Sequence, residues 1–198
     1  MTVAFDIFQG VGIAAAIGIR PFLPSLVVGA LAAGDVEIQF SHTAGYGFLQ
    51  SAPFLLVMLV GAVLLVSLSR GIWETRLQSR LSRVSLGLVA AALGGMFTAA
   101  ALARAGQPVW VGWIGGVLCA AIGLAASTPF LARLRARLDN EAAAVGVPVI
   151  AEGSALLAAA LSVLAPPVGV IVVLALLWLI YRGRGRDDQK YAGLHILG

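Results

Sequence analysis

Six apolar stretches, separated by short segments that carry most of the charges, make up most of this 198-residue chain. They run from Ile7 to Ala33, from Ala52 to Leu68, from Val84 to Ala103, from Val109 to Ala126, from Val147 to Leu164 and from Val168 to Tyr181. A helix rises about 1.5 Å per residue, so about 20 apolar residues cross a hydrocarbon core of roughly 30 Å. The lengths therefore predict an all-α integral membrane protein with about six transmembrane helices.

The composition excludes the soluble classes. Hydrophobic residues make up 60% of the chain and charged residues only 11%, whereas a soluble domain has about 25% charged residues. A soluble surface of this size needs more ionised side chains to stay dispersed. We therefore exclude a disordered chain, a coiled coil and an ordinary cytosolic enzyme, and we interpret residues 1–198 as a single transmembrane helical domain.

The basic residues predict the orientation in the membrane. Eleven of the thirteen follow the second, fourth and sixth stretches: Arg70, Arg76, Arg80, Arg83, Arg133, Arg135, Arg137, Arg182, Arg184, Arg186 and Lys190. Short loops rich in Lys and Arg stay in the cytoplasm. Six spans then place both termini in the cytoplasm of an inner-membrane protein, with 182–198 as a cytoplasmic tail. The sixth stretch is short, which leaves a count of five to seven spans open.

The longest segment on the opposite side runs from Gly34 to Gln50 and holds the aromatic residues Tyr46 and Phe48. Tyrosine and tryptophan are enriched at the membrane–water interface, where their amphipathic rings act as anchors. One interpretation is an interfacial loop with aromatic anchors, and the other is a segment that folds over the mouth of the bundle. The first is the simpler expectation.

Two segments resemble each other and suggest an internal repeat. Residues 15–19 (AAIGI) lead to the tripeptide 21–23 (PFL), and residues 120–124 (AAIGL) lead to the tripeptide 129–131 (PFL). In a six-span protein the first and fourth spans cross in opposite directions, so the two halves would form a three-plus-three inverted repeat, as in many transporters. Chance similarity between spans rich in Ala, Ile, Leu and Gly is the alternative.

The first stretch is interrupted by a charge and two prolines, Arg20, Pro21 and Pro24, just after Gly18. Proline removes a backbone donor and disturbs the helix before it. Irregular backbone at membrane depth is tolerated only against protein or a water-filled cavity. An arginine at the bilayer centre costs at least about 2.5–3.5 kcal/mol on insertion scales. We therefore expect a span broken at Arg20–Pro21, where the arginine has a partner or a cavity.

The best candidate partner within another span is Glu152, which is followed by Gly153 and Ser154. An Arg20–Glu152 pair, or a shared hydrated pocket, would satisfy both charges. The functional interpretation is a substrate or ion pathway with Arg20 as the positive selector and Glu152 as counter-charge or proton carrier. The structural interpretation is an ion pair that joins two spans, or a Glu152 that lies near the cytoplasmic interface. Both remain open.

Catalytic, metal-binding and cofactor motifs are absent from the sequence. Its two histidines, His42 and His195, and its one cysteine, Cys119, form no cluster with metal-ligand spacing, and no GxSxG, Walker A or HExxH motif occurs. The arginines lie in short loops without the interleaved aromatic residues that stack on bases. The sequence therefore predicts neither an enzyme nor a nucleic-acid-binding protein. The expected partners are the lipid bilayer, a small molecule or ion, and a second copy of the chain if the Gly112/Gly116 face packs between molecules.

The chain resembles a bacterial family of small polytopic membrane proteins that is catalogued as a domain of unknown function. The resemblance covers nearly the whole chain and rests on residues 12–24 (GIAAAIGIRPFLP), residues 151–153 (AEG) and a tail of the form KYxGLxIL at 190–197. It implies membrane location.

The leading hypothesis is a transporter or channel-like protein for a small solute, with an anion suiting Arg20. The alternative is a non-transporting scaffold or envelope-biogenesis factor in which the Arg/Glu pair is structural, and a membrane-embedded enzyme comes third.

Overall fold

The computed structural model describes residues 3–40, 43, 45–69 and 80–192, and within these ranges the chain is entirely helical apart from its turns and loops. Its elements are α1 (Val3–Ile19), α2 (Phe22–Ala33), the short 3₁₀-helix η1 (Gly47–Gln50), α3 (Ala52–Ser69), α5 (Arg80–Arg104), α6 (Val109–Arg135), α7 (Asn140–Leu164) and α8 (Pro166–Ala192). Parts of α5, α6, α7 and α8 are long and apolar enough to cross a membrane, while α1, α2 and α3 are shorter apolar helices. The all-helical architecture and these four apolar helices agree with the predicted helical membrane class, and the count of six spans stays a prediction.

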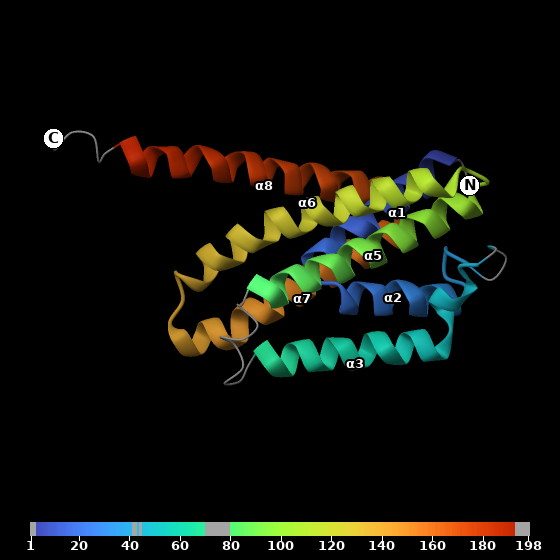
Figure 1. Ribbon diagram of the computed structural model, residues 1–198, viewed down its shortest axis with the longest axis horizontal. Coiled ribbons are helices and arrows are strands. Elements are labelled where there is room, and N and C mark those ends of the chain that lie inside the picture. The colour runs from blue at the N-terminus through green and yellow to red at the C-terminus, as the bar shows by residue number, and fades with distance from the viewer. Residues whose placement is uncertain (1–2, 41–42, 44, 70–79, 193–198) are drawn as a thin grey trace.

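The first apolar stretch forms a helical hairpin. The guanidinium of Arg104 bonds the carboxylate of Asp6, near the start of α1, and the carbonyl oxygen of Glu37, just after α2. Both ends of the stretch therefore lie at the same end of the bundle (Figure 1). The predicted break at Arg20–Pro21 is present, but the chain turns back there instead of continuing across. We call this turn the elbow.

The reversal at the elbow separates the two termini. The end of the bundle that holds Asp6, Glu37 and Arg104 is the N-terminal end, and the end that holds Arg83, Arg135 and the C-terminal half of α8 is the arginine-rich end. Residue 3 and the end of α8 lie at opposite ends of the bundle (Figure 1). The expectation that both termini lie on one side does not agree with this arrangement, because the hairpin adds one reversal of the chain.

Most of the tail motif at 190–197, together with Arg70, Arg76, His42 and His195, lies outside the described residues.

The two similar segments lie on parallel helices. The start of α1 is at the N-terminal end, where Asp6 pairs with Arg104, the last residue of α5. The next helix, α6, begins at Val109, so it starts at the same end and runs in the same direction as α1 (Figure 1). An inverted repeat requires opposite directions. The predicted inversion therefore does not relate these segments.

The same segments pack directly against each other. A Cβ on Gly18 would collide with the backbone of Ala120, and a Cβ on Gly123 would collide with the carbonyl of Ala15. These contacts are reciprocal, because Ala15 and Gly18 occupy the same places in the first segment as Ala120 and Gly123 in the second. Small residues let helix backbones approach where lipid offers no hydrophobic drive to association. Reciprocal contact between parallel helices is what a two-fold axis along the bundle produces.

The segment between α2 and α3 packs into the bundle. Ile38, Phe40 and Leu49 are buried in the main hydrophobic cluster, and the rings of Phe40 and Phe97 meet edge to face with their centroids 6.0 Å apart. The segment therefore packs over the N-terminal end of the bundle, in line with the second interpretation, and its role as an interfacial anchor stays a prediction. Its buried aromatic residue is Phe40, whereas Phe48 is exposed.

The Gly112/Gly116 face packs inside the bundle. A Cβ on Gly112 would meet the backbone of Ala99, and one on Gly116 would meet the backbone of Gly94, both in α5. This close α5–α6 contact accounts for the pattern without a second copy of the chain.

Candidate functional site

The elbow places Arg20 inside the bundle. The last turn of α1 closes with a hydrogen bond from the Arg20 amide to the carbonyl of Ala16 at 3.2 Å. The hydroxyl of Ser25 donates to the carbonyl of Pro21 at 2.6 Å, which satisfies an acceptor at the start of α2. Pro24 is fully buried in the first turn of α2, where a proline lacks a donor that the helix does not need. The sequence around the elbow therefore fixes the position of the arginine.

Arg20 and Glu152 form the predicted pair. Arg20 Nε lies 3.5 Å from Glu152 Oε1, and the two side chains are 20% and 13% exposed. Nε is buried and makes no hydrogen bond within the described part of the chain. The contact therefore balances the charges without a well-aligned hydrogen bond, so Arg20 keeps hydrogen-bonding capacity that water or a ligand can use.

A cavity opens directly beyond the elbow. Helix α1 is central and packs against α5, α6, α7 and α8, but it ends at Ile19 while its neighbours continue. The space that a longer α1 would fill is a cavity of about 560 Å³ that reaches Gly18, Arg20 and Pro21. We call this cavity the vestibule.

The polar lining of the vestibule is mainly basic. Arg20, Arg83 and Arg135 reach it, together with the hydroxyl-bearing residues Ser127 and Thr128. Both hydroxyls donate to the carbonyl of the same residue of α6, at 3.2 and 2.8 Å, so their lone pairs remain able to accept. Clefts lined by one sign of charge with low-dielectric walls concentrate ions of the opposite sign. The vestibule is therefore suited to an anion.

The depth of Arg20 follows from helix lengths. Arg83 lies 21 residues before Arg104 in α5, which is about 31 Å along the helix and close to a full hydrocarbon thickness. Arg20 lies 14 residues beyond Asp6, the partner of Arg104, which is about 21 Å. Along the bundle, Arg20 therefore lies about 10 Å closer than Arg83 to the N-terminal end. In a bilayer with Arg104 at one interface, Arg83 would reach the headgroups of the other.

The other predicted site residues have different roles. Gly18 lines the vestibule and also permits the close contact of α1 with α6. A Cβ on Gly153 would meet open space, so this glycine does not support a helix contact. Ser154 is exposed, and its hydroxyl donates to the carbonyl of Ala151 in its own helix, so it takes no part in the pair. Pro21 lines the vestibule, whereas Pro24 does not.

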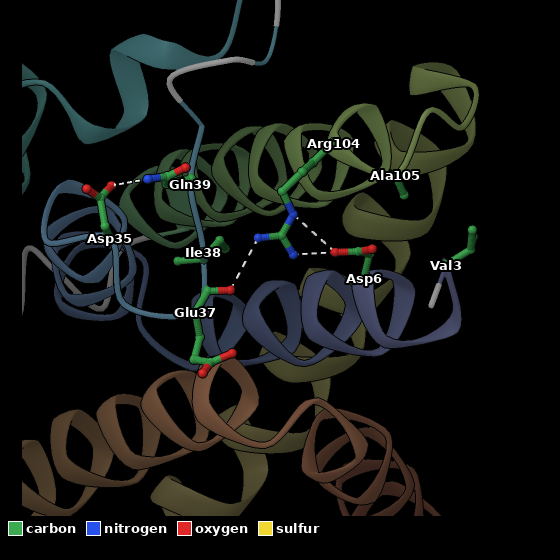
Figure 2. Close-up of a pocket in the computed structure, with 8 residues that line it drawn as sticks. All are labelled: Val3, Asp6, Asp35, Glu37, Ile38, Gln39, Arg104 and Ala105. Atoms are coloured by element: carbon green, nitrogen blue, oxygen red, sulfur yellow. Dashed lines mark hydrogen bonds and ion pairs between the residues drawn. The ribbon is translucent and has the colours of Figure 1, made fainter. Parts of the chain in front are cut away.

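A second charged network lies at the N-terminal end of the bundle (Figure 2). Arg104 binds the carboxylate of Asp6 through two nitrogens and donates to Gln9 Oε1 at 2.7 Å and to the carbonyl of Glu37 at 3.3 Å. Gln9 in turn donates to the carbonyl of Val163 at 3.0 Å. The network therefore ties α1, α5, α7 and the segment after α2 together. It borders a cavity of about 600 Å³.

The backbone beside this network is strained. Asp35 and Glu37 both have positive φ angles, 57° and 58°, a conformation that favours glycine. The side-chain amide of Gln39 donates to the carboxylate of Asp35 at 2.6 Å, which supports the turn (Figure 2). Such strain persists only where the surrounding structure enforces it, and here the bond from Arg104 to Glu37 helps to do so.

The sequence did not predict that Arg83 and Arg135 line a site, because their pattern marks loops and says nothing about which helix face they occupy. It also did not pair Asp6 with Arg104. A usable signal existed, since Arg104 is the only basic residue between the third and fourth stretches and Asp6 begins an apolar helix. Isolated charges beside apolar helices need partners.

Within the described residues, no three His, Cys, Asp or Glu side chains gather in a way that could hold a metal ion. Comparison of the chain with protein-family models, with curated proteins and with solved structures finds no match.

Proposed function

We propose that the protein is a small membrane transporter that binds an anionic solute in the vestibule, with Arg20 as its innermost cationic contact. The observation that carries the proposal is the cavity itself, which leads from the arginine-rich end to Arg20, whose buried Nε makes no hydrogen bond within the described part of the chain. Intramembrane arginines that face a cavity commonly mark substrate or ion pathways. Gly18 and Pro21 shape the wall beside Arg20, and Gly153 leaves space next to Glu152.

The arginine-rich end faces the cytoplasm in this proposal, because loops rich in Arg and Lys stay there. The vestibule then opens to the cytoplasm, the tail 182–198 is cytoplasmic, and the N-terminal end faces outward. The proposal takes this membrane to be a bacterial inner membrane, while the resemblance itself implies only membrane location.

A carrier fits this geometry better than an open channel. Between the elbow and the N-terminal end, residues Ile13 to Ile17 are fully buried, and the Arg104 network ties the outer ends of the helices together. The bundle is thus open on one side of Arg20 and packed on the other, as expected for one state of an alternating-access cycle. Glu152 acts as the counter-charge that an arriving anion displaces from Arg20, or as a proton carrier.

Uptake by proteoliposomes tests the proposal. Radiolabelled inorganic phosphate, sulfate and lactate serve as probes, and Arg20→Gln is compared with Arg137→Gln, an exposed arginine outside the vestibule. We expect uptake of at least one anion by the wild type and by Arg137→Gln, and about a tenfold or larger loss in Arg20→Gln, because a hydrogen bond to a charged group contributes about 1.5–3 kcal/mol. Equal uptake by folded Arg20→Gln protein would contradict the proposal.

The alternative function is a non-transporting scaffold or envelope-biogenesis factor. One observation favours it, namely that the Arg20–Glu152 pair joins the elbow to α7 and so has a structural use of its own. The two functions differ in what the loss of either charge does to stability and to uptake.

A further inference from the structure

A groove on the surface of the bundle adjoins the vestibule. It has a volume of about 460 Å³ and is lined by Arg83, Val84, Gly87 and Leu124. Two of these residues, Arg83 and Leu124, also line the vestibule. The groove lies between α5 and α6, where Val84 is 55% exposed, so in a membrane it faces the acyl chains.

Gly87 is what keeps this groove deep. A Cβ at this position would meet only the side chain of Leu124, at 3.2 Å, and no backbone approaches it. The glycines of the helix contacts differ, because at Gly112 and Gly116 a Cβ would meet the backbone of α5. Gly87 therefore provides space beside a helix without serving a close contact.

The vestibule is also more apolar than a small hydrophilic anion requires. Leu65, Leu86, Leu124, Leu131 and Val147 form much of its wall. Two of these wall residues, Leu65 and Leu86, belong to α3 and α5. Helix α3 packs on α2, η1 and α7, and it makes no extended contact with α5 in the described part of the chain. An amphiphile can use such walls, whereas a hydrated anion gains nothing from them.

We propose that the ligand is a lipid of the cytoplasmic leaflet with an anionic phosphate headgroup. The phosphate lies among Arg83, Arg135 and Arg20, and one acyl chain lies in the groove beside Gly87. This inference rests on the proposed function, because it keeps Arg20 and the vestibule as the anion site. It names an anionic lipid as the preferred substrate, and the soluble anions of the uptake assay then act as headgroup analogues that contact the same arginines without using the apolar walls. Arg83 lies at headgroup level and Arg20 lies deeper, so the phosphate can pass from Arg83 inward to Arg20. Arginine recognises phosphate through paired hydrogen bonds.

The test measures binding to the purified full-length chain in detergent by native mass spectrometry. The lipid probes are dioleoyl phosphatidic acid and dioleoyl phosphatidylcholine, which share their chains, and inorganic phosphate is titrated separately by calorimetry. Gly87→Leu fills the groove, and its matched control is Gly115→Leu, where a Cβ would meet open space. Arg83→Gln/Arg135→Gln removes charge at the vestibule, with Arg137→Gln as its control.

We expect phosphatidic acid to bind about tenfold tighter than phosphatidylcholine, since charge-assisted hydrogen bonds distinguish the two headgroups. Gly87→Leu should weaken phosphatidic acid severalfold and leave inorganic phosphate unchanged, whereas Gly115→Leu should change neither. The double arginine variant should remove the preference for phosphatidic acid. A photoactivatable phosphatidic acid with a diazirine in its acyl chain should crosslink wild-type protein at Val84 or Leu124, which requires no variant to fold.

Three results would overturn the lipid assignment. Equal binding of both lipids would show that charge does not select the ligand. Inorganic phosphate bound as tightly as phosphatidic acid, with no effect of Gly87→Leu, would assign the vestibule to a soluble anion and leave the proposed function intact. Crosslinks spread over the whole apolar surface would show that the groove is not a site. Failure of the proposed function appears separately, as uptake that does not depend on Arg20.

Discussion

Glu152→Gln is expected to leave the protein folded and to reduce anion uptake about tenfold or more. Glutamine keeps the shape of the side chain and removes its charge, and Arg20 still borders the open vestibule, where water can solvate its guanidinium in our proposal. The cost in unfolding free energy should therefore stay below about 1 kcal/mol, well under the roughly 3–5 kcal/mol for breaking a fully buried pair. Without the counter-charge, Arg20 holds a bound anion too strongly for release, so turnover falls while binding persists.

A methionine cycle distinguishes this account from a purely structural pair. Arg20→Met, Glu152→Met and the double variant are compared by thermal unfolding in detergent and by uptake in liposomes. If Arg20 binds the anion, all three variants should be inactive, and the double variant should gain little stability over the single ones. If each single change unfolds the protein and the double change restores it, the pair is structural, because an apolar replacement removes both desolvated charges together. The site hypothesis would then fail.

Arg104→Ala is expected to destabilise the protein by about 3–5 kcal/mol, more than any single polar substitution at the elbow. The side chain of Asp6 is only 7% exposed, and the change leaves its carboxylate, the Gln9 amide oxygen and the Glu37 carbonyl without the arginine that binds them. The midpoint of thermal unfolding measures the effect. Arg137→Ala, at an exposed arginine, is the control.

Adding Asp6→Asn to Arg104→Ala separates the buried charge from the lost packing. The second change removes an unpaired carboxylate, so it should recover part of the lost stability. A loss under about 1 kcal/mol in Arg104→Ala would match an ordinary surface pair and would contradict a role for this network in holding the N-terminal end closed.

The membrane class could be predicted from the sequence because the length and polarity of an apolar run are local properties. The break at Arg20–Pro21 followed from proline chemistry, and the Arg20–Glu152 pair followed from the cost of a lone charge in lipid. The reversal at the elbow could not be predicted in the same way. A proline indicates that a helix ends, but it does not indicate the direction that the chain takes afterwards. A chain that turns back and a chain that continues across the membrane lose the same backbone hydrogen bonds.

The vestibule also could not be predicted from the sequence, because it depends on how the helices pack in the tertiary structure. Arg83 and Arg135 lie where α5 and α6 extend past the end of α1, and it is the early end of α1 that turns their side chains into the walls of a cavity. The positive-inside pattern predicted the side of the membrane on which they lie. It carried no information about the empty space between them, which depends on which helix is central.

The central claim is that a hydrated, positively charged vestibule leads to Arg20, and thiol labelling tests it most directly. Ala132→Cys places a thiol on the vestibule wall, and Ala136→Cys places one at the exposed end of the same helix. Both are made in a Cys119→Ser background, since Cys119 is the one native thiol. Each is treated with an anionic and a cationic methanethiosulfonate reagent of similar size.

We predict that Ala132→Cys reacts with both reagents and that its ratio of anionic to cationic rates exceeds that of Ala136→Cys by about tenfold, because the vestibule concentrates anions. The excess should fall in high salt and in Arg83→Gln. A ratio equal at the two positions, or an Ala132→Cys thiol that reacts with neither reagent, would contradict the account.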